Sequence, residues 1–172
     1  ISGFNNVTFA TNNVSVGFNT TAGTLNLNNT GLITFGATSQ TQNSSFNTTV
    51  NQLGGGNTLF VNGGNLSLNG AINASGTGGS VLANTTTGNL TLNANIAANG
   101  NITLRAGTSA SLQPGVSNGN ITGGDVVRGT ISDGGLTVGT GNNVVIYSGN
   151  ANSNISQAGN LTTMVAGADV ST

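Results

Sequence analysis

The sequence predicts an all-β fold, a parallel β-helix (β-solenoid) with about eight coils of roughly 20 residues each. Three observations lead to this prediction: a short phrase recurs along the chain, apolar and polar residues alternate within it, and Asn and Gly separate its copies. A solenoid buries the apolar face of each coil against the neighbouring coils, so similar residues recur at one position of every coil.

The recurring phrase is Gly-Asn, then Leu or Ile, then Ser or Thr. Its copies start at residues 64, 88, 100, 119 and 159, so the intervals between them are 24, 12, 19 and 40 residues. Looser copies occupy 5–11, 12–18, 23–29, 57–63, 135–141 and 142–149. Most of these intervals fit one or two coils, and the interval of 12 indicates two strands within one turn.

Each copy alternates apolar and polar residues over three to five positions, as in Leu90, Thr91 and Leu92. A period of two is typical of a strand with one buried face. We therefore expect the inward residues to stack into a core ladder. This ladder contains Leu66, Leu68, Leu90, Leu92, Ile102, Leu104, Leu136, Val138, Val144 and Ile146.

The segments between the copies are rich in Asn and Gly, which favour tight turns. Stacked Asn side chains can hydrogen-bond to one another along the axis of such a fold. We therefore expect Asn ladders at the turns. The pattern is the same at both ends of the chain, in 1–11 and in 164–172, so no capping segment is expected.

The chain is expected to be a single solenoid domain over 1–172, less regular over 1–60 and with clearer repeats over 61–172. It begins at Ile1 without Met, which suggests a processed product or a fragment. All six Phe residues lie in the first 60 positions, and we expect them to form a stacked aromatic core. They are Phe4, Phe9, Phe18, Phe35, Phe46 and Phe60.

Charged residues make up only 3% of the chain, compared with about 25% in typical globular proteins. Two Arg and no Lys are too few to neutralise phosphates, so no nucleic-acid partner is expected. No apolar run approaches the roughly 18 residues that span a bilayer, so we do not expect the chain to be membrane-spanning. The absence of Cys excludes disulfides and thiolate metal sites.

Catalysis on a β-helix would need clustered carboxylates or an acid and a base on one face. The candidates are Asp125, Asp133, Arg105 and Arg128, and both Asp residues adjoin Gly, where turn roles are usual. Residues 53–65 faintly resemble a calcium-binding glycine-rich repeat, but Asn57 stands where a carboxylate is needed. We therefore expect no enzyme activity, no catalytic residue, no metal and no cofactor.

The chain is dense in Asn-x-Ser/Thr sequons, which the strand phrase itself generates. Glycosylation at these positions is a second interpretation, because sugars would supply the solubility that charge does not. The sequon residues are Asn6, Asn13, Asn19, Asn28, Asn43, Asn47, Asn65, Asn73, Asn84, Asn89, Asn101, Asn120, Asn154 and Asn160.

The phrases GNLTLNANIAANGNITLRAG at 88–107 and GNLTTMVAGA at 159–168 resemble the repeat region of filamentous haemagglutinin-like bacterial adhesins, the exoproteins of two-partner secretion. The resemblance is clearest over 60–170. The amino-terminal secretion domain of that family carries Asn-Pro motifs, and this chain has none. The resemblance implies a right-handed parallel β-helix, export, and an adhesive or scaffolding role, and it supplies no catalytic residues.

These observations favour an extracellular module, secreted or on the cell surface, with a structural or adhesive role. Its expected partners are copies of itself stacked end to end, the remainder of a longer adhesin, or a host or neighbouring cell surface. A glycan-binding or glycan-cleaving β-helix is a lesser alternative. Ice binding is another alternative, because outward hydroxyls could form a row that orders water: Thr8, Ser15, Ser67, Thr91, Thr103 and Thr137.

Overall fold

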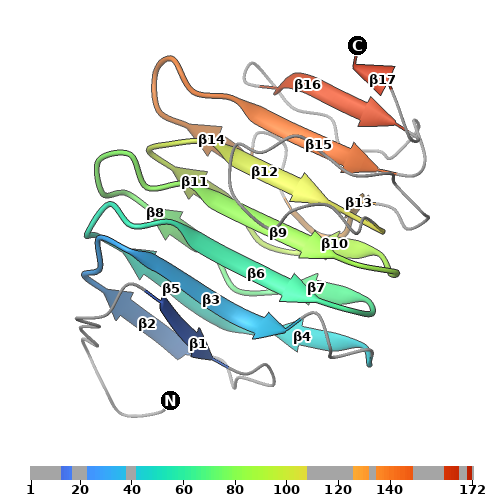
Figure 1. The fold of residues 1–172 in the computed structure, drawn as a ribbon, viewed down its shortest axis with the longest axis horizontal. Coiled ribbons are helices and arrows are strands. Elements are labelled where there is room, and N and C mark those ends of the chain that lie inside the picture. Colours follow the sequence, from blue (N-terminus) through green and yellow to red (C-terminus); the bar gives the residue numbers. More distant parts are fainter. Residues whose placement is uncertain are drawn as a thin grey trace.

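The computed structural model describes residues 13–16, 23–37, 42–107, 126–131, 135–148, 161–166 and 170–171. Every regular element within these ranges is a β-strand, and the strands stack along one axis (Figure 1). The short alternating phrases explain this result, because three to six residues are enough for a strand but not for a helix. The expected all-β parallel solenoid is confirmed.

The strands form three sheets. Sheet A contains β2 (Gly23–Leu27), β5 (Thr48–Gln52), β8 (Ile72–Ala74), β11 (Ile96–Ala98) and β14 (Leu136–Val138). Sheet B contains β1 (Asn13–Val16), β3 (Leu32–Ala37), β6 (Thr58–Asn62), β9 (Val81–Thr85), β12 (Ile102–Arg105), β15 (Val144–Ser148), β16 (Leu161–Ala166) and β17 (Val170–Ser171). Sheet C contains β4 (Ser44–Phe46), β7 (Leu66–Leu68), β10 (Leu90–Leu92) and β13 (Val126–Arg128).

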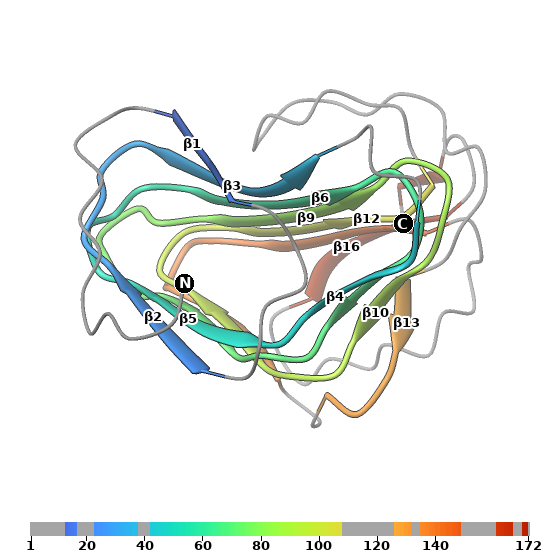
Figure 2. The same cartoon turned by 90° about the horizontal axis from the view of Figure 1, so that it is seen from below.

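Each coil visits sheets A, B and C in turn, so neighbours within a sheet come from successive coils. This order recurs in β2–β3–β4, β5–β6–β7 and β8–β9–β10, and again in β11–β12–β13, where residues 108–125 lie outside the described part. Figure 2, seen along the stack, shows sheet B along one side and sheets A and C closing the other. These coils cross residue 60, where we expected the repeats to become clearer, without any change in sheet order.

The coils are slightly longer than the roughly 20 residues expected from the phrase. Equivalent residues in neighbouring coils are 21 to 25 positions apart in residues 26–101. The next step, from Asn101 to Asn143, takes 42 residues. About three complete turns are therefore described, and the count of eight coils and the handedness stay predictions.

The space between the sheets is filled by inward apolar side chains that form one continuous core. Leu66 pairs with Leu90 and Ile72 with Ile96, so like residues stack from coil to coil. Phe35, Phe46 and Phe60 form an aromatic cluster within this core, with ring centroids 4.9 to 5.0 Å apart. The expected aromatic core is confirmed for these three rings. Phe4, Phe9 and Phe18 lie outside the described residues.

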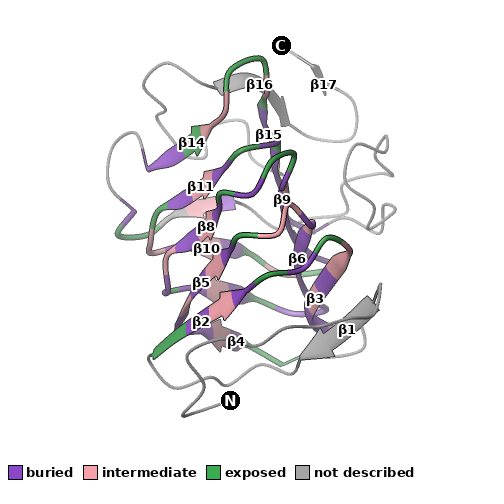
Figure 3. Ribbon diagram, turned by 90° about the vertical axis from the view of Figure 1, so that its left-hand side faces the viewer, coloured by how far each residue is buried: buried purple, intermediate pink, exposed green. Residues whose placement is uncertain are grey.

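Sheet B differs from the expectation of half-buried strands. All five residues of β6 and all five of β9 are buried, although alternate residues point away from the core. Leu59, Val61 and Leu82 form a second apolar cluster on this outer side. Figure 3 shows the contrast with sheet A, whose strands keep partly exposed residues. A period of two cannot reveal burial on both faces, because it reports only the core-facing positions.

The carboxyl-terminal strands also differ from expectation. We expected 164–172 to continue the coil pattern, but β16 is followed by β17, which pairs with it in the antiparallel direction. Ala166 pairs with Val170 and Val165 with Ser171. β17 therefore occupies part of the edge of β16 with which a parallel strand of a further coil would otherwise pair.

The corners between strands require small residues because adjacent coils approach closely there. A Cβ atom added at Gly70 would lie 2.1 Å from the backbone oxygen of Thr48 in the preceding coil. Gly55 and Gly78 adopt positive φ angles of 80°, a conformation that side chains disfavour. Close approach of the coils or a positive φ angle therefore explains the Gly residues at these positions.

Candidate functional surface: asparagine ladders and the outer face of sheet A

An asparagine ladder runs along the corner between sheets C and A. Nδ2 of Asn69 donates to Oδ1 of Asn47, and Nδ2 of Asn93 donates to Oδ1 of Asn69, both at 2.7 Å. In the next coil Thr130 continues the ladder, because its backbone N–H donates to Oδ1 of Asn93. Each of these Asn residues directly follows the last residue of a sheet C strand. The expected Asn ladders at the turns are confirmed.

The other two corners have ladders of mixed composition. At the corner before sheet C, Asn65 donates from Nδ2 to Oδ1 of Asn43 and accepts at Oδ1 from the backbone N–H of Asn89. At the corner before sheet B, side-chain oxygens accept backbone N–H groups from the following coil. The accepting side chains are Asn57, Ser80 and Asn101, and the backbone N–H groups that donate to them belong to Ser80, Asn101 and Asn143 respectively. Side-chain bonds therefore link successive coils at all three corners.

A further ladder lies on the open outer face of sheet A. Nδ2 of Asn51 donates to Oδ1 of Asn26 at 2.8 Å, and Nδ2 of Asn73 donates to Oδ1 of Asn51 at 2.9 Å. The next position of this row is Ala97, followed by Thr137. The ladder therefore stops at Asn73, because a methyl group cannot continue a series of amide hydrogen bonds.

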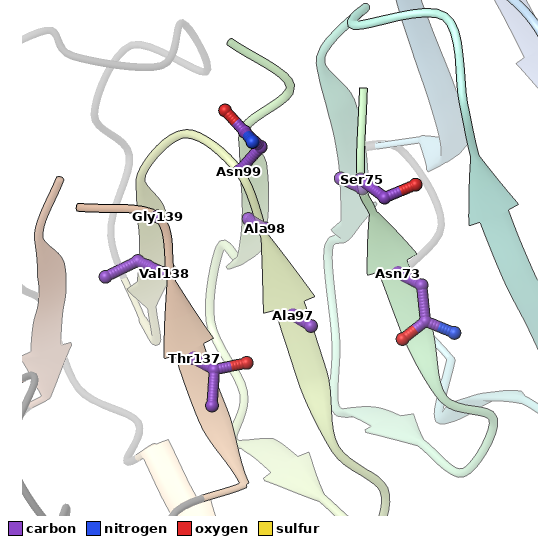
Figure 4. Close-up of a pocket in the computed structure, with 9 residues that line it drawn as sticks. Asn73, Ser75, Ala97, Ala98, Asn99, Thr137, Val138 and Gly139 are labelled. Atoms are coloured by element: carbon purple, nitrogen blue, oxygen red, sulfur yellow. The ribbon is translucent and has the colours of Figure 1, made fainter. Parts of the chain in front are cut away.

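A hollow of about 480 Å³ lies where this ladder stops. It is lined by the last two residues of β8, β11 and β14 and by the residue after each strand, and no residue of sheet B or C contributes. The hollow is therefore on the outer side of sheet A. Figure 4 shows Asn73, Ala97 and Thr137 in a row on three neighbouring strands, with the small Ala97 between the two larger side chains.

An exposed leucine lies on the same side of the molecule. Leu53 follows β5 as Ser75, Asn99 and Gly139 follow β8, β11 and β14, and each donates its backbone N–H to the preceding coil at the equivalent place. Ser75, Asn99 and Gly139 line the hollow. The side chain of Leu53 is 56% exposed, and among the described residues no other large apolar side chain is exposed.

The structure places the predicted core ladder on all three sheets. Nine of its ten residues are at most 1% exposed, and Val138 is partly buried against the same core. Leu66, Leu68, Leu90 and Leu92 line sheet C, and Leu136 and Val138 belong to sheet A. The remaining four, in β12 and β15, line sheet B.

The sequon residues fall into different environments. Asn84 is fully buried, so its amide is inaccessible in the folded chain. Asn28 is exposed at the corner after β2. Several sequon residues serve as ladder members: Asn43, Asn47, Asn65, Asn73, Asn89 and Asn101. The side chains of Asn6, Asn13, Asn19, Asn120, Asn154 and Asn160 lie outside the described part.

The structure brings no catalytic group together among the charged candidates that it describes. Arg105 lies on the outer side of sheet B and is only 1% exposed. Asp125, Asp133 and the side chain of Arg128 fall outside the described residues. Asn57, weighed as a calcium-site position, instead accepts the backbone N–H of Ser80. Within the described ranges no group of three or more His, Cys, Asp or Glu residues could hold a metal ion.

The hydroxyls considered for ice binding do not form one row. Ser67 and Thr91 pair in sheet C, whereas Thr103 is on sheet B and Thr137 on sheet A. Thr103 is also only 7% exposed. Thr8 and the side chain of Ser15 lie outside the described part. The described hydroxyls that motivated the ice-binding alternative are therefore distributed over three sheets.

Comparisons with protein-family models, curated proteins and solved structures find no match for this chain. In the part of the chain that the structure describes, no helix has the length and apolar character needed to cross a bilayer.

Sequence reasoning missed two features of the outer faces of the sheets. One is the hollow at Ala97, and the other is the buried outer side of sheet B with Asn84 and Arg105. The hollow could have been anticipated by aligning the phrases NLSLNGAINA and NLTLNANIAA, in which Ala97 replaces Asn73. A signal for the outer side of sheet B is also present, because Leu59 to Val61 and Val81 to Ala83 are uninterrupted apolar runs, which are typical of strands buried on both faces.

Proposed function

We propose that this chain is an extracellular structural or adhesive β-solenoid module of a bacterial surface fibre or adhesin. The observation that carries the proposal is the set of side-chain ladders at all three corners, which add coil-to-coil bonds to those of the sheets. Such bonds run along the axis on which the coils stack, so pulling or local opening along this axis must break several of them together. A mechanical role requires this kind of cohesion.

The composition supports the same proposal. The described outer faces of sheets A and C bear Asn, Ser, Thr, Ala and one Val, and the whole chain has a formal net charge of only −1. Weak charge removes the long-range repulsion that would oppose association of copies. The finer features belong to the proposal as well: a right-handed sense, about eight coils, and secretion or display at the cell surface, as in the adhesins that the phrases resemble.

Electron microscopy of the negatively stained, purified chain tests this proposal. Unbranched filaments support end-to-end stacking of copies, and short uniform rods support a module of a longer adhesin. A compact particle without a long axis would overturn the mechanical role. A pull-down on intact cells then distinguishes an adhesive module, which is retained on the cells, from a purely structural one, which is not.

A further inference from the structure

We propose that the outer face of sheet A is a self-association surface, on which Leu53 of one copy inserts into the hollow beside Ala97 of a second copy. The hollow has a small apolar residue at its centre, and Leu53 is the large apolar side chain exposed on the same face. The inference concerns the side of the solenoid and does not depend on the coil ends invoked above.

The geometry suits a twofold contact. Leu53 lies in the same row as Ser75 and Asn99, which line the hollow, and it is two coils before Asn99. A twofold axis that lies in the plane of the interface, perpendicular to the line from Leu53 to the hollow and midway along it, brings each Leu53 to the hollow of the other copy. Two identical contacts then form at once, as in any isologous dimer.

Charge and polarity on this face are compatible with such a contact. No charged residue belongs to the described strands of sheet A or to the residues that line the hollow. Nδ2 of Asn73 is satisfied by Asn51, which leaves its Oδ1 at the end of the ladder, next to Ala97. Together with the exposed hydroxyl of Thr137, it offers polar partners around the apolar contact.

The size of the face predicts a weak dimer. Five strands about 4.8 Å apart, with about four residues each at about 3.3 Å per residue, cover roughly 300 Å². A stable interface buries about 800 Å² per partner, so we expect a reversible dimer that is best detected by covalent trapping.

Cysteine cross-linking tests the contact directly, because the chain has no native Cys. Leu53→Cys and Ala97→Cys are purified separately, mixed, and oxidised gently. We expect a disulfide-linked dimer in the mixture at several times the yield of either variant alone. The two positions cannot cross-link within one chain, because two coils separate them by about 9.6 Å, beyond the roughly 7 Å limit for Cα atoms.

The matched control mixes Leu53→Cys with Thr91→Cys, which is also half-buried but lies on sheet C. Equal yields from the control and the 53–97 mixture would overturn the proposal. A second test uses Leu53→Asp and Ala97→Arg, measured by sedimentation. Each variant alone should be monomeric and their mixture should recover the dimer, whereas failure to recover it in folded variants counts against the contact.

These tests also distinguish the inference from the proposed function. Leu53→Asp should abolish the lateral dimer and leave any end-to-end filaments intact in electron micrographs, because sheet A is not the coil end. Loss of the filaments in this variant, together with a lateral dimer that persists in sedimentation, would contradict the assignment of the face.

Discussion

Nδ2 of Asn73 donates to Oδ1 of Asn51 at 2.9 Å, although 22 residues separate the two in sequence. The same bond recurs one coil earlier, where Asn51 donates to Asn26. Asn51 is thus both donor and acceptor. A side chain in this position couples three successive coils, so the stability of one coil depends on its neighbours.

Asn51→Ala should lower the free energy of unfolding by about 1–3 kcal/mol, because two part-buried hydrogen bonds are lost at about 0.5–1.5 kcal/mol each. Urea unfolding followed by circular dichroism measures the change. Asn28→Ala is the matched control, because Asn28 is exposed and lies outside the ladder. Equal effects of the two substitutions would show that the ladder contributes nothing.

Phe46→Ala should destabilise the first coils by about 3–5 kcal/mol, since it leaves a cavity between Phe35 and Phe60. Phe46→Leu should cost less, because it retains most of the apolar volume. Thermal unfolding of both variants checks this order. A loss of less than about 1 kcal/mol in the Ala variant would mean that the cluster is not a packed core.

Gly70→Ala should destabilise the chain by about 1–3 kcal/mol or more, because its Cβ would clash with the backbone oxygen of Thr48. Gly23→Ala is the control, since a Cβ at Gly23 meets no atom within 4 Å. The midpoints of urea unfolding compare the two. If both variants unfold at the wild-type midpoint, the coils are not as close at this corner as described.

Asn84→Leu should leave stability unchanged or raise it by about 1–2 kcal/mol, because neither amide atom of this buried residue has a hydrogen-bond partner. The opposite result is expected for Asn62→Leu. Asn62 is equally buried, but its Nδ2 donates to the backbone oxygens of Gln42 and Asn65. Its replacement should cost about 1–3 kcal/mol. Similar losses in both variants would indicate that Asn84 is satisfied in solution.

The repeated phrase predicted strands correctly but not which strands are neighbours. The copies at Gly64 and Gly88 lead into β7 and β10, which pair in sheet C. The copy at Gly100 leads into β12 of sheet B, with β11 between. The interval of 12 therefore separates strands on different sheets within one turn, as expected. The phrase serves two sheets because Gly88 and Gly100 both approach the preceding coil closely, and the Asn after each of them bonds to the neighbouring coils.

The sequence by itself determined the class of fold, the inward residues and the bonding at the corners. These follow from local rules: alternation selects a strand with a buried face, and Asn and Gly select turns. Only the tertiary structure decided the assignment of strands to three sheets, the burial of the outer side of sheet B, and the position of Leu53 on the same face as the hollow at Ala97. These features depend on coil length, which changes from 21 to 42 residues, and a local pattern carries no information about stacking across such distances.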